Sequence, residues 1–266
     1  MYSGIPFPNI GPIAVQIGGF ALRWYSLAYL AGILFAWTMA KRMVEKYRSP
    51  FTKDMVDDAV FYGTFGMILG ARIGYVLFYN FHYYFEHPLQ ILALWQGGMS
   101  FHGALLGIIV GLYAFSRRMK IGFFTITDVF AAVGTIGVFF GRLANFANAE
   151  LYGRVTTSVP WAMVFPNAGP MPRHPSQLYE ALLEGLVIFA VLYPLWTKSV
   201  WVRIRIGFTS GLFLVLYALS RGIIENFREP DAHIGFLFGS VTMGQLLTLP
   251  MLIGGVVIMI WSMRNK

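Results

Sequence analysis

Cysteine is absent from this 266-residue chain, and only 12% of its residues are charged. The missing thiols exclude disulfide bonds, cysteine metal sites and a nucleophilic thiol supplied by the protein. A soluble domain carries about a quarter charged residues. With 57% hydrophobic residues and a mean hydropathy of +0.61, the composition therefore argues against a soluble protein.

Motifs for metal or nucleotide chemistry are also missing. The chain has no HExxH motif and no glycine-rich phosphate loop. We therefore expect no cofactor and no metal. The net charge of +8 could indicate a nucleic-acid partner, but the basic residues lie in short loops between apolar blocks, so no nucleic acid is expected.

The apolar residues come in blocks long enough to cross a bilayer, which needs about 20 residues per helix. Because no water reaches that depth, the backbone must pair internally, which favours helices. We predict an all-α, polytopic integral membrane protein with seven transmembrane helices, forming one catalytic domain over 1–266. The predicted spans are 14–40, 55–79, 98–116, 122–142, 176–197, 206–227 and 240–263.

Lysine and arginine are distributed differently between the loops. Thirteen basic residues cluster at 41–53, 117–120, 198–205 and 264–266, in alternation with loops at 80–97, 143–175 and 228–239. The positive-inside rule then places the N-terminus outside and the C-terminus in the cytoplasm. The segment 143–175 is expected to form a small extracytoplasmic cap between spans 4 and 5.

All six lysines belong to these clusters, whereas the seven other basic residues are all arginine. Arginine keeps its charge when desolvated and offers a planar donor fork to phosphate or carboxylate. This distribution indicates a buried anionic ligand or internal ion pairs. The seven are Arg23, Arg72, Arg142, Arg154, Arg173, Arg221 and Arg228.

Four polar side chains near the end of the sixth span are spaced to share one helix face within roughly 80°. They are Tyr217, Arg221, Glu225 and Arg228. Two arginines to one glutamate leave a positive excess, which suits an anion. An intrahelical salt bridge from Arg221 to Glu225 is the structural alternative, and both interpretations can hold together.

The fourth span runs into a second polar segment, which holds Arg142, Asn145, Asn148, Glu150 and Arg154. It forms either a ligand site or a polar knot that fixes the cap to the helices. Asp128 is expected to be structural. Glu180 and Glu184 are four residues apart and are expected to pair with Arg72 or Arg173 rather than to act as catalytic acids.

Histidine offers one candidate proton acceptor. His102 opens the third span, and its imidazole can take up a proton near neutral pH. The alternative is a histidine that only makes structural hydrogen bonds. His174, which opens the segment before the fifth span, is expected to support the site.

The run from Gly141 to Arg154, with Asn145, Glu150 and Gly153 within it, resembles the signature of bacterial prolipoprotein diacylglyceryl transferases. The similarity extends over nearly the whole chain. Its other parts are Arg23-Trp-Tyr25, His102-Gly103, His174-Pro-Ser-Gln-Leu-Tyr179-Glu180, and the face from Tyr217 to Arg228 followed by Pro230-Asp231.

This resemblance implies an enzyme of the bacterial inner membrane. It transfers the diacylglyceryl group of phosphatidylglycerol to the lipobox cysteine of a prolipoprotein signal peptide, forming a thioether and releasing glycerol-1-phosphate. The active site lies towards the outer face. A membrane lipid transporter or flippase is the alternative, although no repeat pair or broken span supports it.

The resemblance also assigns roles to individual residues. Arg142 and Arg221 are expected to bind the phosphate, and His102 to make the substrate thiolate. The residues expected to bind substrate are Tyr25, Asn145, Glu150, Gly153, Tyr217, Glu225 and Arg228.

Overall fold

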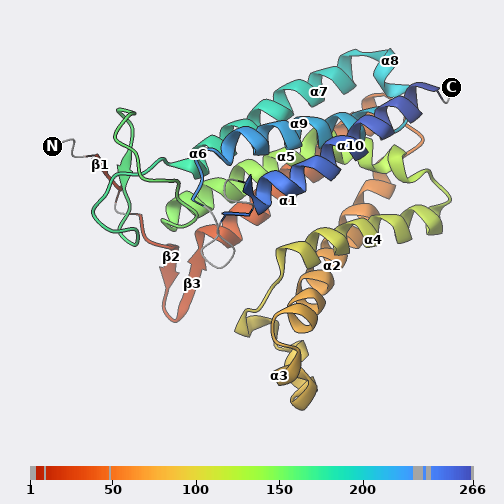
Figure 1. The fold of residues 1–266 in the computed structure, drawn as a ribbon. Coiled ribbons are helices and arrows are strands. Elements are labelled where there is room, and N and C mark those ends of the chain that lie inside the picture. The colour runs from red at the N-terminus through yellow and green to blue at the C-terminus, as the bar shows by residue number, and fades with distance from the viewer. Residues whose placement is uncertain (1–3, 9, 48, 230–235, 238–240, 265–266) are drawn as a thin grey trace. The chain divides into compact units, whose positions relative to one another are not determined.

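The structure is a computed structural model that describes residues 4–8, 10–47, 49–229, 236–237 and 241–264. Helices dominate the described residues (Figure 1). Five of them are long and apolar enough to cross a membrane, which confirms the prediction of an all-α membrane protein. They are Trp24–Lys46 (α1), Lys53–Phe78 (α2), Phe123–Ala147 (α5), Ser176–Lys198 and Met243–Arg264 (α10).

Two further helices overlap the remaining predicted spans. These are α4 (Phe101–Met119) and the 17-residue apolar helix α9 (Phe208–Ile224). Neither is among the five helices that satisfy the criteria of length and hydropathy. The count of seven spans therefore stays a prediction.

The predicted start of the first span, at residue 14, is wrong. Strands β2 (Ile13–Ile17) and β3 (Phe20–Arg23) form an antiparallel hairpin there, and α1 begins only at Trp24. β-branched residues at every second position favour a strand, and Gly18 turns the chain with a φ of 58°. The apolar run therefore contains two kinds of secondary structure.

The fifth predicted span is one continuous helical run with an unusual middle. Helix α6 (Ser176–Glu180) leads into a π-helical segment, η3 (Ala181–Val187), and then into α7 (Ile188–Lys198). A short helix, α8 (Val200–Arg203), precedes α9. π-Helical turns are rare and often mark functional sites.

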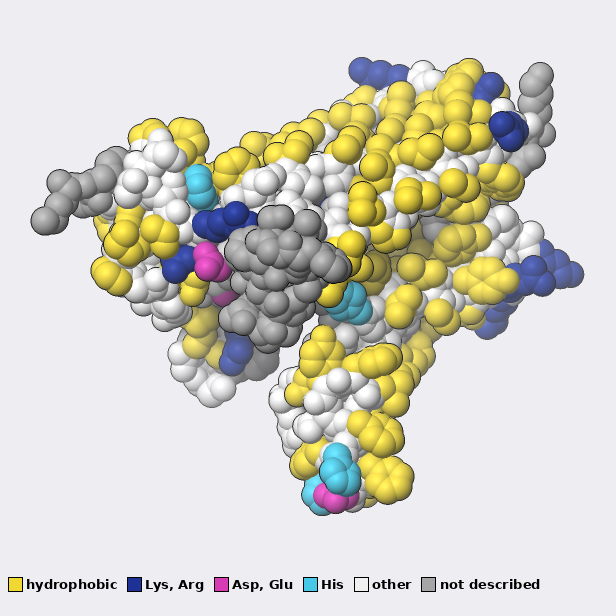
Figure 2. Space-filling model, viewed as in Figure 1, with side chains coloured by type: hydrophobic (Ala, Val, Ile, Leu, Met, Phe, Trp, Pro, Cys, Tyr) yellow, Lys and Arg dark blue, Asp and Glu magenta, His cyan; other side chains and the backbone are white. Residues whose placement is uncertain are grey.

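The chain divides into two compact units, which are described separately. The larger unit contains Met1–Met39 and Asp128–Lys266, and the smaller unit contains Ala40–Thr127. In the larger unit α9 and α10 lie side by side (Figure 1). Hydrophobic side chains cover the visible surface of these helices and of α7, as expected for helices that face lipid (Figure 2).

The smaller unit depends on close packing of α2 against α4. Glycines spaced four residues apart on the two helices face each other, with Gly66 and Gly70 of α2 against Gly103 and Gly107 of α4. A methyl group added at Gly66 would collide with the carbonyl oxygen of Gly107. Glycine thus allows the two backbones to touch.

The loop between α2 and α4 is held by a buried arginine. It contains α3 (Phe81–Glu86) and two 3₁₀ helices, η1 (Pro88–Leu92) and η2 (Leu94–Gln96). Arg72, only 2% exposed, donates from Nε to the carbonyl of Ile91 at 2.9 Å, and its other nitrogens bind the carbonyls of four further loop residues. Its guanidinium therefore has a structural role within this unit.

The predicted cap begins later than expected. Helix α5 continues to Ala147, so 143–147 are helical and the irregular part covers 148–175. Within it, strand β4 (Met163–Val164) pairs in parallel with β1 (Ile5–Pro6). Strands β5 (Phe236–Leu237) and β6 (Val241–Thr242) pair antiparallel before α10.

Asp128 has the structural role that was expected, because it binds the N-terminal end of α9. Its carboxylate accepts hydrogen bonds from the backbone N–H groups of Gly207 and Ser210, at 2.6 and 2.7 Å. Because these N–H groups begin a helix, a carboxylate there satisfies donors that have no partner within the helix.

We predict that Gly66→Ala destabilises the protein by about 1–3 kcal/mol, because the added methyl group meets backbone that cannot move aside. Gly63→Ala on the same helix is the control, since its methyl group would lie 3.6 Å from the flexible Leu112 side chain. Thermal unfolding in detergent should separate the two variants. Equal melting temperatures would contradict the packing argument.

Candidate functional site

Six charged side chains of the larger unit form one connected network. Arg142 comes from α5, and Glu180 and Glu184 come from α6 and the π-helical segment. Arg221 comes from α9, whereas Glu225 and Arg228 follow its last residue, Ile224, so the predicted sixth span ends earlier than residue 227. Residues more than 80 positions apart in sequence therefore meet in one cluster.

The two glutamates of the fifth span connect the arginines. Glu180 lies 3.0 Å from Arg142 and 3.0 Å from Arg221. Glu184 lies 3.3 Å from Arg142 and 3.5 Å from Arg221. The expected pairing of these glutamates with Arg72 or Arg173 is therefore wrong, because the fold brings α5 and α9 to either side of the fifth span.

The excess of positive charge that was predicted for the face from Tyr217 to Arg228 is not present in the network as a whole. The network contains three arginines and three glutamates, so its formal charges balance. The carboxylates of Glu180 and Glu184 are 0% exposed, whereas the side chains of Arg142 and Arg221 are 17% and 13% exposed. The two arginines are thus the more exposed partners, and the two carboxylates are fully buried.

The salt bridge from Arg221 to Glu225 is confirmed, at 2.6 Å, and Arg228 lies 3.7 Å from the same carboxylate. Glu225 also accepts a hydrogen bond of 2.7 Å from the hydroxyl of Thr242 and packs against Gly244. The beginning of α10 therefore fixes the glutamate that holds Arg221.

A second polar cluster joins α1 to the end of α5. The hydroxyl of Tyr25 donates to the Glu150 carboxylate and accepts from the Asn145 amide. The same amide donates to Glu150 at 2.9 Å. An electrostatic interaction between Tyr25 and Arg142 connects this cluster to the arginine network. Tyr217 also belongs to the network, since it accepts a hydrogen bond from Arg142.

The structure also contains polar contacts that fix the cap to the helices, as the alternative interpretation predicted. The Arg154 guanidinium donates to the carbonyls of Arg228 and Glu225, at 2.9 and 3.0 Å. The N–H of Gly153 donates to the carbonyl of His174 at 2.9 Å. A side chain at Gly153 would collide with the backbone of His174 and Phe227. Gly153 therefore contributes close backbone packing.

His102 belongs to a different compact unit from this network. His102 is the second residue of α4 and is exposed, and it belongs to the smaller unit, whereas every arginine and glutamate of the network belongs to the larger one. Its role as a base stays a prediction. Pro230 and Asp231, which are part of the resemblance, lie outside the described residues.

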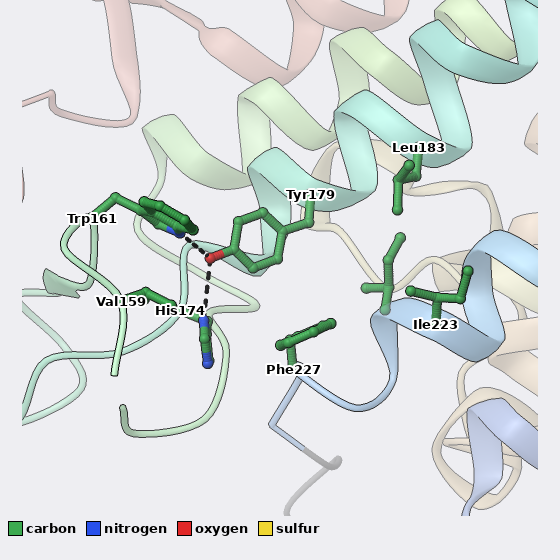
Figure 3. A pocket seen from close by; sticks show the side chains of 8 residues that line it. Val159, Trp161, His174, Tyr179, Leu183, Ile223 and Phe227 are labelled. Carbon is green, nitrogen blue, oxygen red and sulfur yellow. Dashed lines mark hydrogen bonds between the residues drawn. The ribbon is translucent and has the colours of Figure 1, made fainter. Parts of the chain in front are cut away.

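A small apolar cavity of about 230 Å³ lies between α6, α9 and the cap (Figure 3). Its lining includes Val159, Leu183, Ile223 and Phe227, and the described lining residues include no arginine and no carboxylate. On α9, Ile223 points about 160° away from Arg221, and Phe227 follows the end of the helix. The cavity is therefore separate from the charged network.

One polar group closes the cap end of this cavity. The hydroxyl of Tyr179 accepts a 2.6 Å hydrogen bond from the Trp161 indole and lies 3.1 Å from Nδ1 of His174 (Figure 3). Partial burial lowers the pKa of the His174 imidazole below its ordinary value of 6.5. His174 contacts Tyr179 at the cap, and its predicted support of the site stays a prediction.

Sequence reasoning missed the central position of Glu180 and Glu184. Their spacing of four residues in an apolar span was the available signal, because buried carboxylates require partners. Thr242 and Gly244 gave no signal, since a threonine before a helix and a glycine in its first turn are ordinary residues there. Only the fold shows that they surround Glu225.

The chain matches the family described as prolipoprotein diacylglyceryl transferase over residues 12–261. A phosphatidylglycerol–prolipoprotein diacylglyceryl transferase of Paramagnetospirillum magneticum is 52% identical over 265 residues, which cover 100% of this chain and 98% of the relative. The proteins of that name from Rhodospirillum rubrum and Rickettsia felis are each 51% identical. They cover 100% and 94% of this chain, and 97% and 95% of their own lengths.

We predict that His174 makes the stability of the protein sensitive to acid. Because its pKa is lowered by folding, its contribution is complete above pH 6.5 and is lost as the pH falls through the folded-state value. Melting temperatures measured between pH 7.5 and 5 should fall less in His174→Gln than in the wild type. The exposed loop residue His87 provides the control substitution, His87→Gln. An unchanged pH dependence in His174→Gln would contradict this role.

Proposed function

This chain belongs to the prolipoprotein diacylglyceryl transferase family, and from that premise we propose how its residues carry out the reaction. The protein is a transferase that moves the diacylglyceryl group of phosphatidylglycerol to a prolipoprotein. Its apolar helices make it a multi-pass membrane protein of the bacterial inner membrane. A lipid transporter or flippase has no support in the comparisons.

The acceptor is the thiol of the lipobox cysteine in the prolipoprotein signal peptide. Its sulfur bonds to the glyceryl carbon of phosphatidylglycerol while the bond from that carbon to the phosphate oxygen breaks. The phosphate oxygen keeps the electron pair, so the products are a thioether and glycerol-1-phosphate. The thiol proton passes to a base and then to the solution. A chain without cysteine is suited to this reaction, since the substrate supplies the nucleophile.

The leaving phosphate is bound by Arg142 and Arg221. The observation that supports this assignment is their convergence from two helices onto the same pair of carboxylates, with their own side chains partly exposed. Each guanidinium has five N–H donors, so donors remain for phosphate oxygens after the carboxylates are satisfied. Fixed donors stabilise the negative charge that develops on the leaving oxygen.

The remaining residues shape and orient this site. Glu225 orients Arg221, and Arg228 adds positive charge at the mouth of the site. Tyr25, Asn145 and Glu150 form the polar wall next to Arg142 that receives the glycerol head group. Two further residues have different roles. Tyr217 contacts Arg142, and Gly153 lets the cap backbone pack closely against the end of α9.

His102 is the base that forms the substrate thiolate. A free thiol has a pKa near 8.5 and is mostly protonated at neutral pH, so a proton acceptor accelerates its attack. The position of His102 at the beginning of α4 and its exposure leave the imidazole accessible within its unit.

The site lies towards the outer face of seven spans, beneath the cap at 148–175, with the N-terminus outside and the C-terminus in the cytoplasm. The basic clusters support this topology, because α5 and α9 both begin next to one. At 1.5 Å per residue, Arg142 lies about 29 Å from the start of α5 and Arg221 about 20 Å from the start of α9. Both distances support a position of the arginines far from the cytoplasmic side of a hydrocarbon layer about 30 Å thick.

The transfer is tested by incubating the purified chain with phosphatidylglycerol and a lipobox peptide, followed by mass spectrometry. Wild type should add a diacylglycerol mass at the cysteine. Arg142→Ala and Arg221→Ala should each lower the rate at least about 100-fold, because fixed donors to the leaving oxygen are lost.

Two further variants make this result specific. Arg142→Lys keeps the charge but loses the planar fork, and should also be slow. Arg205→Ala, which removes an arginine stacked on Trp201 before α9, should keep near-normal activity. Near-normal turnover in Arg142→Ala or Arg221→Ala would remove the phosphate assignment.

His102→Gln should slow the transfer by about 100-fold or more at neutral pH, where a positioned base contributes most. The loss should shrink as the pH rises towards the pKa of the thiol. Rates measured from pH 6 to 9 check this expectation. Substantial residual activity at pH 7 would exclude His102 as the base.

A further inference from the structure

Glu180 and Glu184 make the same contacts in the same orientation. In each carboxylate one oxygen, Oε2, faces Arg142 and the other, Oε1, faces Arg221. The two arginines come from different helices, α5 and α9. The carboxylate pair is therefore a double bridge that sets the separation of the two guanidinium groups.

The bridge cannot itself be the surface that meets a substrate. Both glutamate side chains are 0% exposed, whereas the arginine side chains retain 17% and 13% exposure. An approaching phosphate reaches the guanidinium groups first and finds the carboxylates behind them. Because each guanidinium has five N–H donors, a phosphate would use donors that the carboxylates do not occupy.

The backbone segment that carries Glu184 packs closely against α5. Glu184 lies within the π-helical segment, and its neighbour Gly185 packs directly against α5. A Cβ atom at Gly185 would lie 2.7 Å from the Cβ of Phe139. Because real side chains never approach that closely, the segment that carries Glu184 has little freedom to move relative to α5.

Stability alone is a weak reason for burying these charges. Removing two carboxylates from water costs several kcal/mol per ion, and apolar side chains of similar volume are often as stabilising as a buried ion pair. Positioning of the two guanidinium groups explains the buried charges better, since small displacements of catalytic groups reduce rates strongly.

We propose that Glu180 and Glu184 are positioning residues for diacylglyceryl transfer, which hold Arg142 and Arg221 as one rigid phosphate-binding unit. The inference rests on the proposed function, because it takes the two arginines as the phosphate ligands. The glutamates touch neither substrate nor the reacting atoms and act only through the arginines.

The competing explanation is that the glutamates only hold the helices together. The two explanations differ in what the loss of one negative charge does to anion binding. If the bridge positions the arginines, a neutral replacement slows turnover, while the uncompensated positive charge binds an anion more tightly. If the bridge is merely structural, its loss weakens folding, anion binding and turnover together.

The experiment uses the full chain in phosphatidylglycerol micelles with a lipobox peptide, and glycerol-1-phosphate as the inhibitor. Glu180→Gln and Glu184→Gln should each lower kcat about 10- to 100-fold. The inhibition constant of glycerol-1-phosphate should fall roughly 3- to 10-fold in both variants. Glu229→Gln is the matched control, since this half-exposed glutamate pairs with Arg173 of the cap and should change neither quantity.

Glu184→Asp provides a second variant in case glutamine prevents folding. Aspartate keeps the charge but shortens the reach by one methylene, so kcat should fall at least about 10-fold with an unchanged inhibition constant. Normal kcat in the aspartate variant, or in both glutamine variants, overturns the proposal. Weaker inhibition accompanied by a lower melting temperature also overturns it in favour of a structural role.

These outcomes are separable from failure of the proposed function. Absence of transfer by wild type would remove the function itself, and full activity of Arg142→Ala would remove the phosphate assignment. Only normal kcat or weakened inhibition in the glutamate variants, with wild type active and the arginine variants inactive, removes the positioning role.

Discussion

The pairing of Arg142 and Arg221 with Glu180 and Glu184 is the interaction on which the larger unit depends. A charge in an apolar layer is costly unless a partner compensates it. Three helical segments that carry such charges must therefore meet at one level. Their meeting produces a polar site inside an otherwise apolar bundle, in which the arginine side chains stay partly exposed.

The rest of the unit supports that meeting. Thr242 and Gly244 fix Glu225 from the beginning of α10, while Arg154 ties the cap to the end of α9. Asp128 secures the other end of the same helix. Each contact joins segments distant in sequence, so the position of Arg221 results from restraints at both ends of α9. A preorganised site requires this kind of support.

Particular residues show how far prediction from sequence reached. The helices at 53–78, 123–147 and 243–264 agree with predicted spans, because long apolar blocks in a membrane have few alternatives to a helix. The hairpin at 13–23 was missed because hydropathy does not distinguish a short apolar strand from the beginning of a span. The intrahelical pair of Arg221 and Glu225 was found because its spacing is local.

By itself, the sequence determined that this is a helical membrane protein, that its unusual charges are arginines, and which family it belongs to. These properties follow from composition, local spacing and motifs. Only the tertiary structure decided which glutamates neutralise which arginines, and that the network is balanced rather than positive. The physical reason is that pairing across helices depends on how α5, the fifth span and α9 pack, and that packing is not encoded in the spacing within any one of them.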